Sequence, residues 1–184
     1  MPKMCHSKQP FTGIEMYRPH SSANAWTIQR LQDLDPDEHD YQEFKSSPYL
    51  EAENGINSLF IEHFSKQLAA FANGGGGRIF IGIDDNGQID GGVRTQLKKG
   101  GTRSWLEDVL PDLVSPRLQD INIFEVLSEG PNSPIRPDCA VYIVDIPQSR
   151  IAPHQARDKR YYLRIAGKSR PMTHIHVMDV MRRT

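Results

Sequence analysis

The stretch from Asn54 to Gly87, NGINSLFIEHFSKQLAAFANGGGGRIFIGIDDNG, is the part of the sequence that most constrains the fold. Apolar side chains recur at three- and four-residue spacings over residues 56–71, which predicts an amphipathic helix. Asn73 and Gly74 predict the end of that helix, since both residue types adopt left-handed backbone easily. RIFIGI is apolar on both faces, as in a central strand, and the closing Asn-Gly pair predicts a tight turn. The chain must therefore pack a helix against a buried strand.

The remaining segments predict further helices and strands. Hydrophobic spacing predicts a helix over residues 26–34, after a Ser21/Ser22 cap region, and another over residues 102–114 that ends near Pro111. Alternating apolar side chains predict strands at residues 41–45, 120–128, 139–147 and 160–167, of which the second and third pair antiparallel. Residues 174–183 are compatible with a helix or a strand. This order indicates an α+β fold with a mixed or antiparallel sheet packed with helices.

The chain of 184 residues is expected to form a single domain over residues 23–184, preceded by a loose N-terminal arm over residues 1–22. Its apolar runs are far shorter than the roughly 20 residues that cross a bilayer, and its first residues lack the apolar middle of a signal peptide. Cys5 and Cys139 have no CxxC spacing, which argues against a disulfide scaffold and favours the cytoplasm.

Charge is unevenly distributed along the chain. Residues 32–55 contain eight Asp and Glu but one base, Lys45, whereas residues 150–184 contain nine Lys and Arg but two Asp. A basic face beside an acidic pocket suits a protein that handles phosphodiesters around metal ions. The same pattern also suits two complementary parts of one domain that attract each other, and composition favours neither reading.

The glycine run GGGGRIFIG does not match a nucleotide-binding loop. A phosphate-binding P-loop requires GxxxxGK[ST], and the dinucleotide fingerprint opens a helix, whereas this run precedes a strand. The run instead indicates a helix end followed by close approach of the backbone to a neighbouring element. An ATP-binding protein is therefore the weakest of the functions considered.

Glu38, Glu43 and Asp85 are candidate ligands of a divalent metal ion. Carboxylates from separate elements can hold a cation that activates water against a phosphodiester. Glu38 and Glu43 can meet only if the chain changes structure between them, because five residues separate them by about 140° on a helix and by a half-turn on a strand. Lys45 shares the strand face of Glu43 and is the candidate to assist the reaction.

Each of these residues also has a structural interpretation. Glu38 fits a capping box with Asp35, with Pro36 at the first helical position. Asp85 fits a turn residue, and Glu43 with Lys45 fits the exposed face of an edge strand. His174 and His176 would share one face if the HIHV segment were extended, where they could bind zinc or copper, although no third ligand is evident.

Three segments resemble the Schlafen AlbA-type domain in order and with comparable spacing: YQEFKSS, LAAFANGGGGRIFIGIDDNGQIDG and RYYLRIAGKSRPM. The similarity runs from about Trp26 to the C-terminus. It implies an α+β domain that binds nucleic acid, and it aligns Glu38, Glu43 and Asp85 with the metal-binding acids of the RNA-cutting vertebrate Schlafens. Gly74 replaces the Thr that commonly follows Asn in the family, and the segment between EFK and the long helix is a few residues longer.

The leading hypothesis is a cytoplasmic Schlafen-like endoribonuclease that cleaves structured RNA such as tRNA with Mg²⁺ or Mn²⁺. A homodimer is expected, because the vertebrate core places two such lobes around a basic groove. The alternative is a non-catalytic module that binds DNA or RNA, or a transcriptional regulator. Tyr161 and Tyr162 flank the groove candidates, one of them packing in the core. The basic residues expected to contact the nucleic-acid backbone are Lys98, Lys99, Arg103, Arg157, Lys159, Arg160, Arg164, Lys168 and Arg170.

Overall fold

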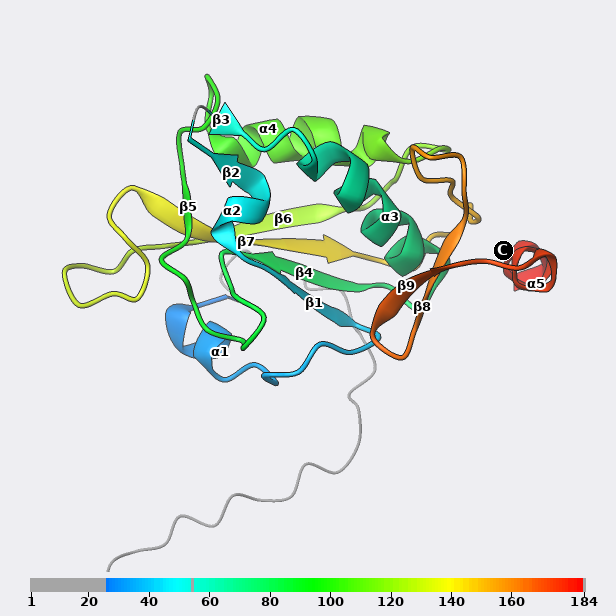
Figure 1. The fold of residues 1–184 in the computed structure, drawn as a ribbon, viewed down its shortest axis with the longest axis horizontal. Helices are drawn as coiled ribbons and strands as arrows, with labels where there is room; N and C mark the ends of the chain where they lie inside the picture. The colour runs from blue at the N-terminus through cyan, green and yellow to red at the C-terminus, as the bar shows by residue number, and fades with distance from the viewer. Residues whose placement is uncertain (1–25, 54, 184) are drawn as a thin grey trace, which may run out of the picture.

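A mixed sheet organises the residues that the computed structural model describes, 26–53 and 55–183 (Figure 1). The order of its strands is β1-β4-β7-β5, and β6 pairs with the other edge of β7. β1 runs parallel to β4, whereas β4, β5 and β6 all run antiparallel to β7. The predicted α+β class with a mixed sheet is confirmed. The strands are β1 (Gln42–Lys45), β4 (Gly77–Ile81), β5 (Val93–Arg94), β6 (Asn122–Leu127) and β7 (Cys139–Ile146).

Helices cover both faces of this sheet. On one face α3 (Phe60–Asn73), α4 (Thr102–Val109) and the 3₁₀ helix η2 (Leu110–Leu113) pack on side chains such as Ile79 and Ile81. On the other face α1 (Ile28–Gln32) packs on Phe80 and its neighbours. The alternation of β4 thus builds two cores, which is why its sequence is apolar on both faces.

The short α1 begins at Thr27, whose Oγ1 accepts a hydrogen bond from the Arg30 N–H at 3.2 Å. The helix expected over residues 26–34 is confirmed, although it is shorter than its apolar pattern. The Ser21/Ser22 cap region and the arm over residues 1–22 lie outside the described residues. Helix α4 ends where η2 begins, and Pro111 lies in η2.

The glycine run joins α3 to β4 by close approach. A Cβ on Gly77 would lie 2.4 Å from the ring of Phe71, so the strand can begin there only with glycine. Gly74 has φ −89°, so left-handed backbone at this position was a wrong expectation, and Gly76 with φ 79° supplies it instead. The run leads into β4, as expected, and not into a helix N-terminus.

The segment before β1 is a turn and not a capped helix. The Asp35 carboxylate accepts a hydrogen bond from the Asp37 N–H at 3.1 Å, which is a local turn within two residues. The Glu38 carboxylate reaches forward to the Phe44 N–H at 2.9 Å instead of back to Asp35. The predicted capping box is therefore wrong, because the Glu38 carboxylate instead accepts a main-chain N–H at the edge of β1.

Several short elements were not evident in the sequence. Helix α2 (Ser47–Leu50) follows β1, and β2 (Glu51–Ala52) pairs with β3 (Gly55–Ile56), so that Ile56 precedes the long helix instead of belonging to it. The strand expected at residues 160–167 is β8 (Tyr162–Ile165), which forms a hairpin with β9 (Lys168–Pro171). This hairpin packs on α3 (Figure 1).

Residues 174–183 form helix α5 (His174–Arg183). Two residues apart on a helix, His174 and His176 point about 200° apart, so the shared face that an extended HIHV would give does not form. None of the helices among residues 26–53 and 55–183 has the length and apolar character needed to cross a membrane.

Candidate functional site

Glu38 and Glu43 converge on the ammonium group of Lys45. Glu43 lies in the middle of β1, and Lys45 two residues later shares its face. The Lys45 Nζ lies 2.6 Å from Glu43 Oε1 and 3.7 Å from Glu38 Oε1. The change from turn to strand between residues 38 and 43 thus brings the two carboxylates together, as the five-residue interval required.

The Glu43 carboxylate is buried and fully engaged. Its Oε2 lies 2.5 Å from Arg164 Nη1, and its Oε1 accepts a hydrogen bond from Gln67 Nε2 at 2.7 Å in addition to Lys45. The Glu43 side chain is 7% exposed and that of Arg164 is 3% exposed. Glu43 is therefore not the exposed face of an edge strand, because α3 and β8 cover it with charge-matched partners.

Arg164 lies in the interior instead of on the basic surface where it was expected. Its Nη2 donates to the main-chain carbonyls of His39 at 3.0 Å and of Gln42 at 3.3 Å. Its guanidinium also lies over the ring of Phe71, 4.6 Å from the centroid. Arg164 thus anchors β8 to the turn before β1, and it is not available to contact a ligand.

Asp85 does not join the other two acids. It is exposed in the turn after β4, while the neighbouring Asp84 holds the turn by accepting the N–H groups of Asn86 and Gln88, each at 2.9 Å. The hydrogen bond from Gln88 is the largest cause that lowers the pKa of Asp84. The turn predicted from Asn86-Gly87 is confirmed, and Gly87 adopts φ 73° there.

The predicted carboxylates do not fit a complete Mg²⁺ or Mn²⁺ site in this arrangement. Within the described residues, no group of three His, Cys, Asp or Glu side chains could hold a metal ion. Glu43 has no free oxygen, and Asp90, a later acid of the same loop, is engaged at Ser47. The Asp90 carboxylate accepts the Ser47 N–H at 2.6 Å and the Ser47 hydroxyl at 2.5 Å.

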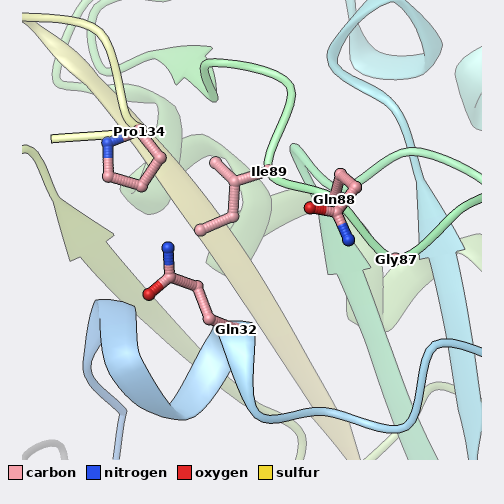
Figure 2. Close-up of a pocket in the computed structure, with 5 residues that line it drawn as sticks. All are labelled: Gln32, Gly87, Gln88, Ile89 and Pro134. Carbon is pink, nitrogen blue, oxygen red and sulfur yellow. The ribbon is translucent and has the colours of Figure 1, made fainter.

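A hollow of about 180 Å³ lies beside the turn that carries Asp85 (Figure 2). It is formed between α1, the turn after β4 and the loop between β6 and β7. Its lining contains no ionisable side chain, so it adds no ligand to the candidate acids. The residues that line it are Gln32, Gly87, Gln88, Ile89 and Pro134.

The acidic and basic parts of the sequence do contact each other. Arg164 pairs with Glu43, and the Gly167 N–H in the turn of the β8–β9 hairpin donates to Asp40 Oδ1 at 2.7 Å. Asp158, an acid within the basic segment, is instead bound by Lys66 of α3 and by the Tyr162 hydroxyl. Attraction between two complementary parts of the domain therefore explains some of these charges. It does not explain the exposed basic residues.

The expected groove residues fall into two groups. Lys98, Lys99 and Arg103 belong to the start of α4 and the loop before it, and Arg103 pairs with Glu107 at 2.9 Å. Figure 1 shows β5, which leads into that loop, at the opposite end of the sheet from the hairpin β8–β9. The second group lies on this hairpin and the loop before it. Its exposed members are Arg157, Lys159, Arg160, Lys168 and Arg170.

Tyr162 packs in the core while Tyr161 is half-buried, as strand alternation requires. The Tyr162 hydroxyl donates to Asp158 at 2.6 Å, and burial followed by this bond raises the pKa of Tyr162 to about 12. Tyr162 is thus a structural residue at the base of the basic loop.

His154 is a buried residue that the sequence did not single out. Its Nδ1 lies 2.6 Å from the Pro116 carbonyl and its Nε2 lies 2.7 Å from the Ser149 hydroxyl. Because a carbonyl can only accept, Nδ1 carries the proton and Ser149 donates to Nε2. Burial lowers the pKa of His154 below its ordinary value of 6.5, so the folded protein holds this ring neutral.

The protein is expected to lose stability as the pH falls from 7 towards 5. The pKa of His154 is higher in the unfolded chain than in the folded protein. At a pH between these two pKa values the unfolded chain binds a proton at His154 and the folded protein does not, so the unfolding free energy decreases as the pH falls. His39, whose pKa burial also lowers, adds to this trend. Thermal unfolding of the wild type and of His154→Gln across this range provides the measurement. An equal slope in both proteins would exclude His154 as the source.

Comparison with known proteins places this geometry in a family. A model of the family described as Schlafen, AlbA_2 matches residues 38–173. This range contains β1, α3, the main sheet and the β8–β9 hairpin. These elements define a Schlafen AlbA-type domain, and this chain belongs to the Schlafen AlbA_2 family.

A solved structure supports the fold. The crystal structure of the DIP2311 protein from Corynebacterium diphtheriae matches this chain with a TM-score of 0.55 and 18% sequence identity. The match covers 84% of this chain and 27% of that one, so this chain spans about a quarter of the length of the DIP2311 protein. No curated protein matches this chain.

Proposed function

We propose that this protein binds nucleic acid through contacts to the sugar–phosphate backbone, with RNA favoured and DNA possible. One observation carries the proposal: exposed cations gather on the β8–β9 hairpin and the loop before it, in a member of a nucleic-acid-associated family. Asp158, the acid of that loop, already accepts from Tyr162 and pairs with Lys66. The carboxylate of Asp158 is thus engaged locally, and the exposed cations around it can release counterions from a phosphate chain.

The position of these cations supports recognition of backbone shape. Lys159 and Arg160 lie on a loop. Lys168 and Arg170 are two residues apart on β9 and therefore share one face of the strand. Contacts from a loop and a strand to phosphates fix the register of a nucleic acid and carry no base sequence directly. Arg164 lies beneath this surface and orients the hairpin that presents it.

Reversing two charges on the hairpin is expected to weaken binding. The variant Lys168→Glu/Arg170→Glu should bind a fluorescent RNA hairpin at least about tenfold more weakly, and its salt slope should fall by about 2, since each lost phosphate contact lowers the slope by about one. Fluorescence anisotropy at increasing NaCl measures both quantities, and a DNA of the same sequence tests the preference for RNA.

The matched control is Lys98→Glu/Lys99→Glu, which makes the same charge change at the opposite end of the sheet. It should retain most of the affinity. Equal weakening by both variants would show that net charge, and not the hairpin surface, governs binding. Binding of neither RNA nor DNA by the wild type would end the proposal.

A homodimer in the cytoplasm completes the proposal. Helix α5 carries exposed Ile175 and Met181, which would gain from burial against a second copy. A two-fold pair would present two hairpins to one duplex. Light scattering should give a mass of about twice 20.9 kDa. The free thiol of buried Cys139 suits a reducing compartment.

Cleavage of structured RNA such as tRNA with Mg²⁺ or Mn²⁺ is the second candidate function. The observation that favours it is the convergence of Glu38 and Glu43 at Lys45. This activity requires Glu43 to be released from Arg164 and Asp85 to approach. Incubation of tRNA with Mn²⁺ tests it: cutting by the wild type that is lost in Glu43→Ala supports a nuclease, and salt-sensitive binding without cutting supports the binding module.

A further inference from the structure

We propose that a polar cavity at the hairpin end of the sheet holds the 3′-terminal nucleotide of an RNA strand, with the ribose hydroxyls on Asp120 and the phosphate on Arg150. The inference rests on the proposed function and names the feature of the RNA that the protein recognises. The cavity has a volume of about 360 Å³, within the range of about 300–1,000 Å³ that is typical of small-molecule sites.

The cavity lies close to the basic loop and hairpin of the proposed function. Residues 147–151, which form one of its walls, follow β7, and β7 ends at the same end of the sheet as the β8–β9 hairpin (Figure 1). Gly75 lies on another wall, and a Cβ on the adjacent Gly74 would lie 3.8 Å from Leu163 of β8. Seven residues separate Arg150 from Arg157, at most about 25 Å of extended chain. An RNA strand bound at the basic loop can therefore place its end in the cavity.

Ser149 fixes the wall formed by residues 147–151. Its N–H donates to the Ala72 carbonyl at 3.0 Å, which ties this wall to the last turn of α3. Its hydroxyl accepts the Ile151 N–H at 3.1 Å and donates to His154 Nε2 at 2.7 Å. The cavity is thus formed before a ligand arrives, and a preformed site lowers the entropy cost of binding.

Asp120 and Arg150 bring opposite charges to this cavity without pairing with each other. Both side chains are exposed, and neither makes an ion pair or a side-chain hydrogen bond within residues 26–53 and 55–183. A ligand that carries an anion and hydroxyl donors matches the two groups, because a guanidinium binds phosphate and a carboxylate accepts O–H donors. A ribonucleotide carries both, and a carboxylate is a known partner of ribose hydroxyls.

The carboxylate of Asp120 favours the last nucleotide of a strand over an internal one. In an internal nucleotide the 3′ oxygen carries the next phosphate, whose negative charge would face Asp120. At the 3′ end of RNA the 2′ and 3′ hydroxyls are both free, and one carboxylate can accept from both. A DNA end lacks the 2′ hydroxyl. The cavity therefore favours RNA over DNA, and a free 3′ end over a phosphorylated one.

The rest of the polar lining does not select one base. Gln119 and Gln148 line the cavity with carboxamides, which both donate and accept and can rotate to suit the edge of any base. The smaller hollow in Figure 2 also carries two carboxamides, but its lining has no charged group for a phosphate. The end of the strand, and not its sequence, is thus what the larger cavity recognises.

The experiment measures binding of a short single-stranded RNA, labelled at its 5′ end, to the purified chain by fluorescence anisotropy. The RNA with a free 3′ end should bind at least about tenfold more tightly than the same RNA with a 3′-phosphate, and a 2′-deoxy last nucleotide should give an intermediate affinity. In Asp120→Asn the free and phosphorylated RNAs should bind within about twofold of each other. Arg150→Gln should weaken binding of the free-ended RNA and lower its salt slope by about 0.7, as for one phosphate of a single strand.

The substitution Asp120→Asn is suited to this test, because Asp120 has φ 60° and Asn also adopts left-handed backbone readily. Glu129→Gln is the matched control, an exposed acid in the loop between β6 and β7, and it should keep the full preference for the free end.

Three results would overturn the assignment while leaving backbone binding by the hairpin intact. The first is equal affinity of the wild type for the free and phosphorylated RNAs, and the second is an unchanged preference in Asp120→Asn. The third is displacement of the labelled RNA by AMP as readily as by unlabelled RNA, which would assign the cavity to a free nucleotide. Failure of the wild type to bind any RNA would instead end the proposed function, and this inference with it.

Discussion

Replacement of Asn73 by alanine is expected to lower the free energy of unfolding by about 3–5 kcal/mol, because it leaves three buried main-chain groups without partners at about 1–3 kcal/mol each. Asn73 is fully buried at the last position of α3. Its Nδ2 donates to the carbonyls of His154 at 2.9 Å and Tyr162 at 3.0 Å, and its Oδ1 accepts the His154 N–H at 2.6 Å.

The effect is large because these bonds join distant parts of the chain. His154 and Tyr162 lie 81 and 89 residues from Asn73, so one amide ties the end of α3 to the loop before β8 and to β8 itself. Serine or alanine cannot span both partners. The basic loop would lose its attachment together with the stability of the core.

Urea unfolding of Asn73→Ala measures this prediction, and Asn122→Ala is its control. Asn122 lies exposed on β6, and its side chain donates to the nearby carbonyl of Asp120 at 3.3 Å. Its replacement should change the unfolding free energy by no more than about 0.5 kcal/mol. A loss below about 1 kcal/mol for Asn73→Ala would contradict the assigned role.

The long elements of this fold were predictable because their periodicity is local. Helix α3 repeats every three to four residues, and β4, β6 and β7 are apolar runs bounded by turn residues. The strands that the sequence did not reveal have two to four residues, as in β5 with Val93 and Arg94. Such segments show no period of their own, because only pairing with a neighbouring strand extends them: β5 pairs with β7, β2 with β3, and β9 with β8.

The candidate site was predictable in part. The five-residue interval between Glu38 and Glu43 excludes a shared face on any regular element, and this indicated that a turn must bring them together. The partners of Glu43 could not be placed, since Arg164 lies 121 residues further along the chain and Gln67 belongs to another element. Their proximity depends on how α3 and β8 cover β1.

One signal could have identified Arg164. Tyr162 and Arg164 lie two residues apart on a strand, so a buried Tyr162 implies that Arg164 also faces inward. An inward arginine requires a carboxylate partner. Among the acids of residues 32–55, Glu43 lies on β1, which runs parallel to β4. Like β8, β1 contacts α3. Counting Arg164 among surface cations overlooked this alternation.

Replacement of Arg164 by alanine is expected to lower the free energy of unfolding by about 3 kcal/mol, at the lower end of the range for breaking a buried ion pair, because Lys45 and Gln67 still contact Glu43. The loss includes two hydrogen bonds to the turn before β1 and the contact with Phe71. Urea unfolding measures it, and Arg170→Ala on the exposed partner strand should remain within about 0.5 kcal/mol of the wild type.

A double-mutant cycle with Glu43→Gln separates the charge pair from the other contacts of Arg164. If the pair contributes as the 2.5 Å distance indicates, the coupling free energy of Glu43 and Arg164 should exceed about 1 kcal/mol, within the range of about 0.5–3 kcal/mol for residues in contact. Strict additivity would mean that Arg164 stabilises the fold only through His39, Gln42 and Phe71. In that case the loss of Arg164 would cost the same with and without the charge of Glu43. Arg164 could then not be the group that neutralises the Glu43 carboxylate.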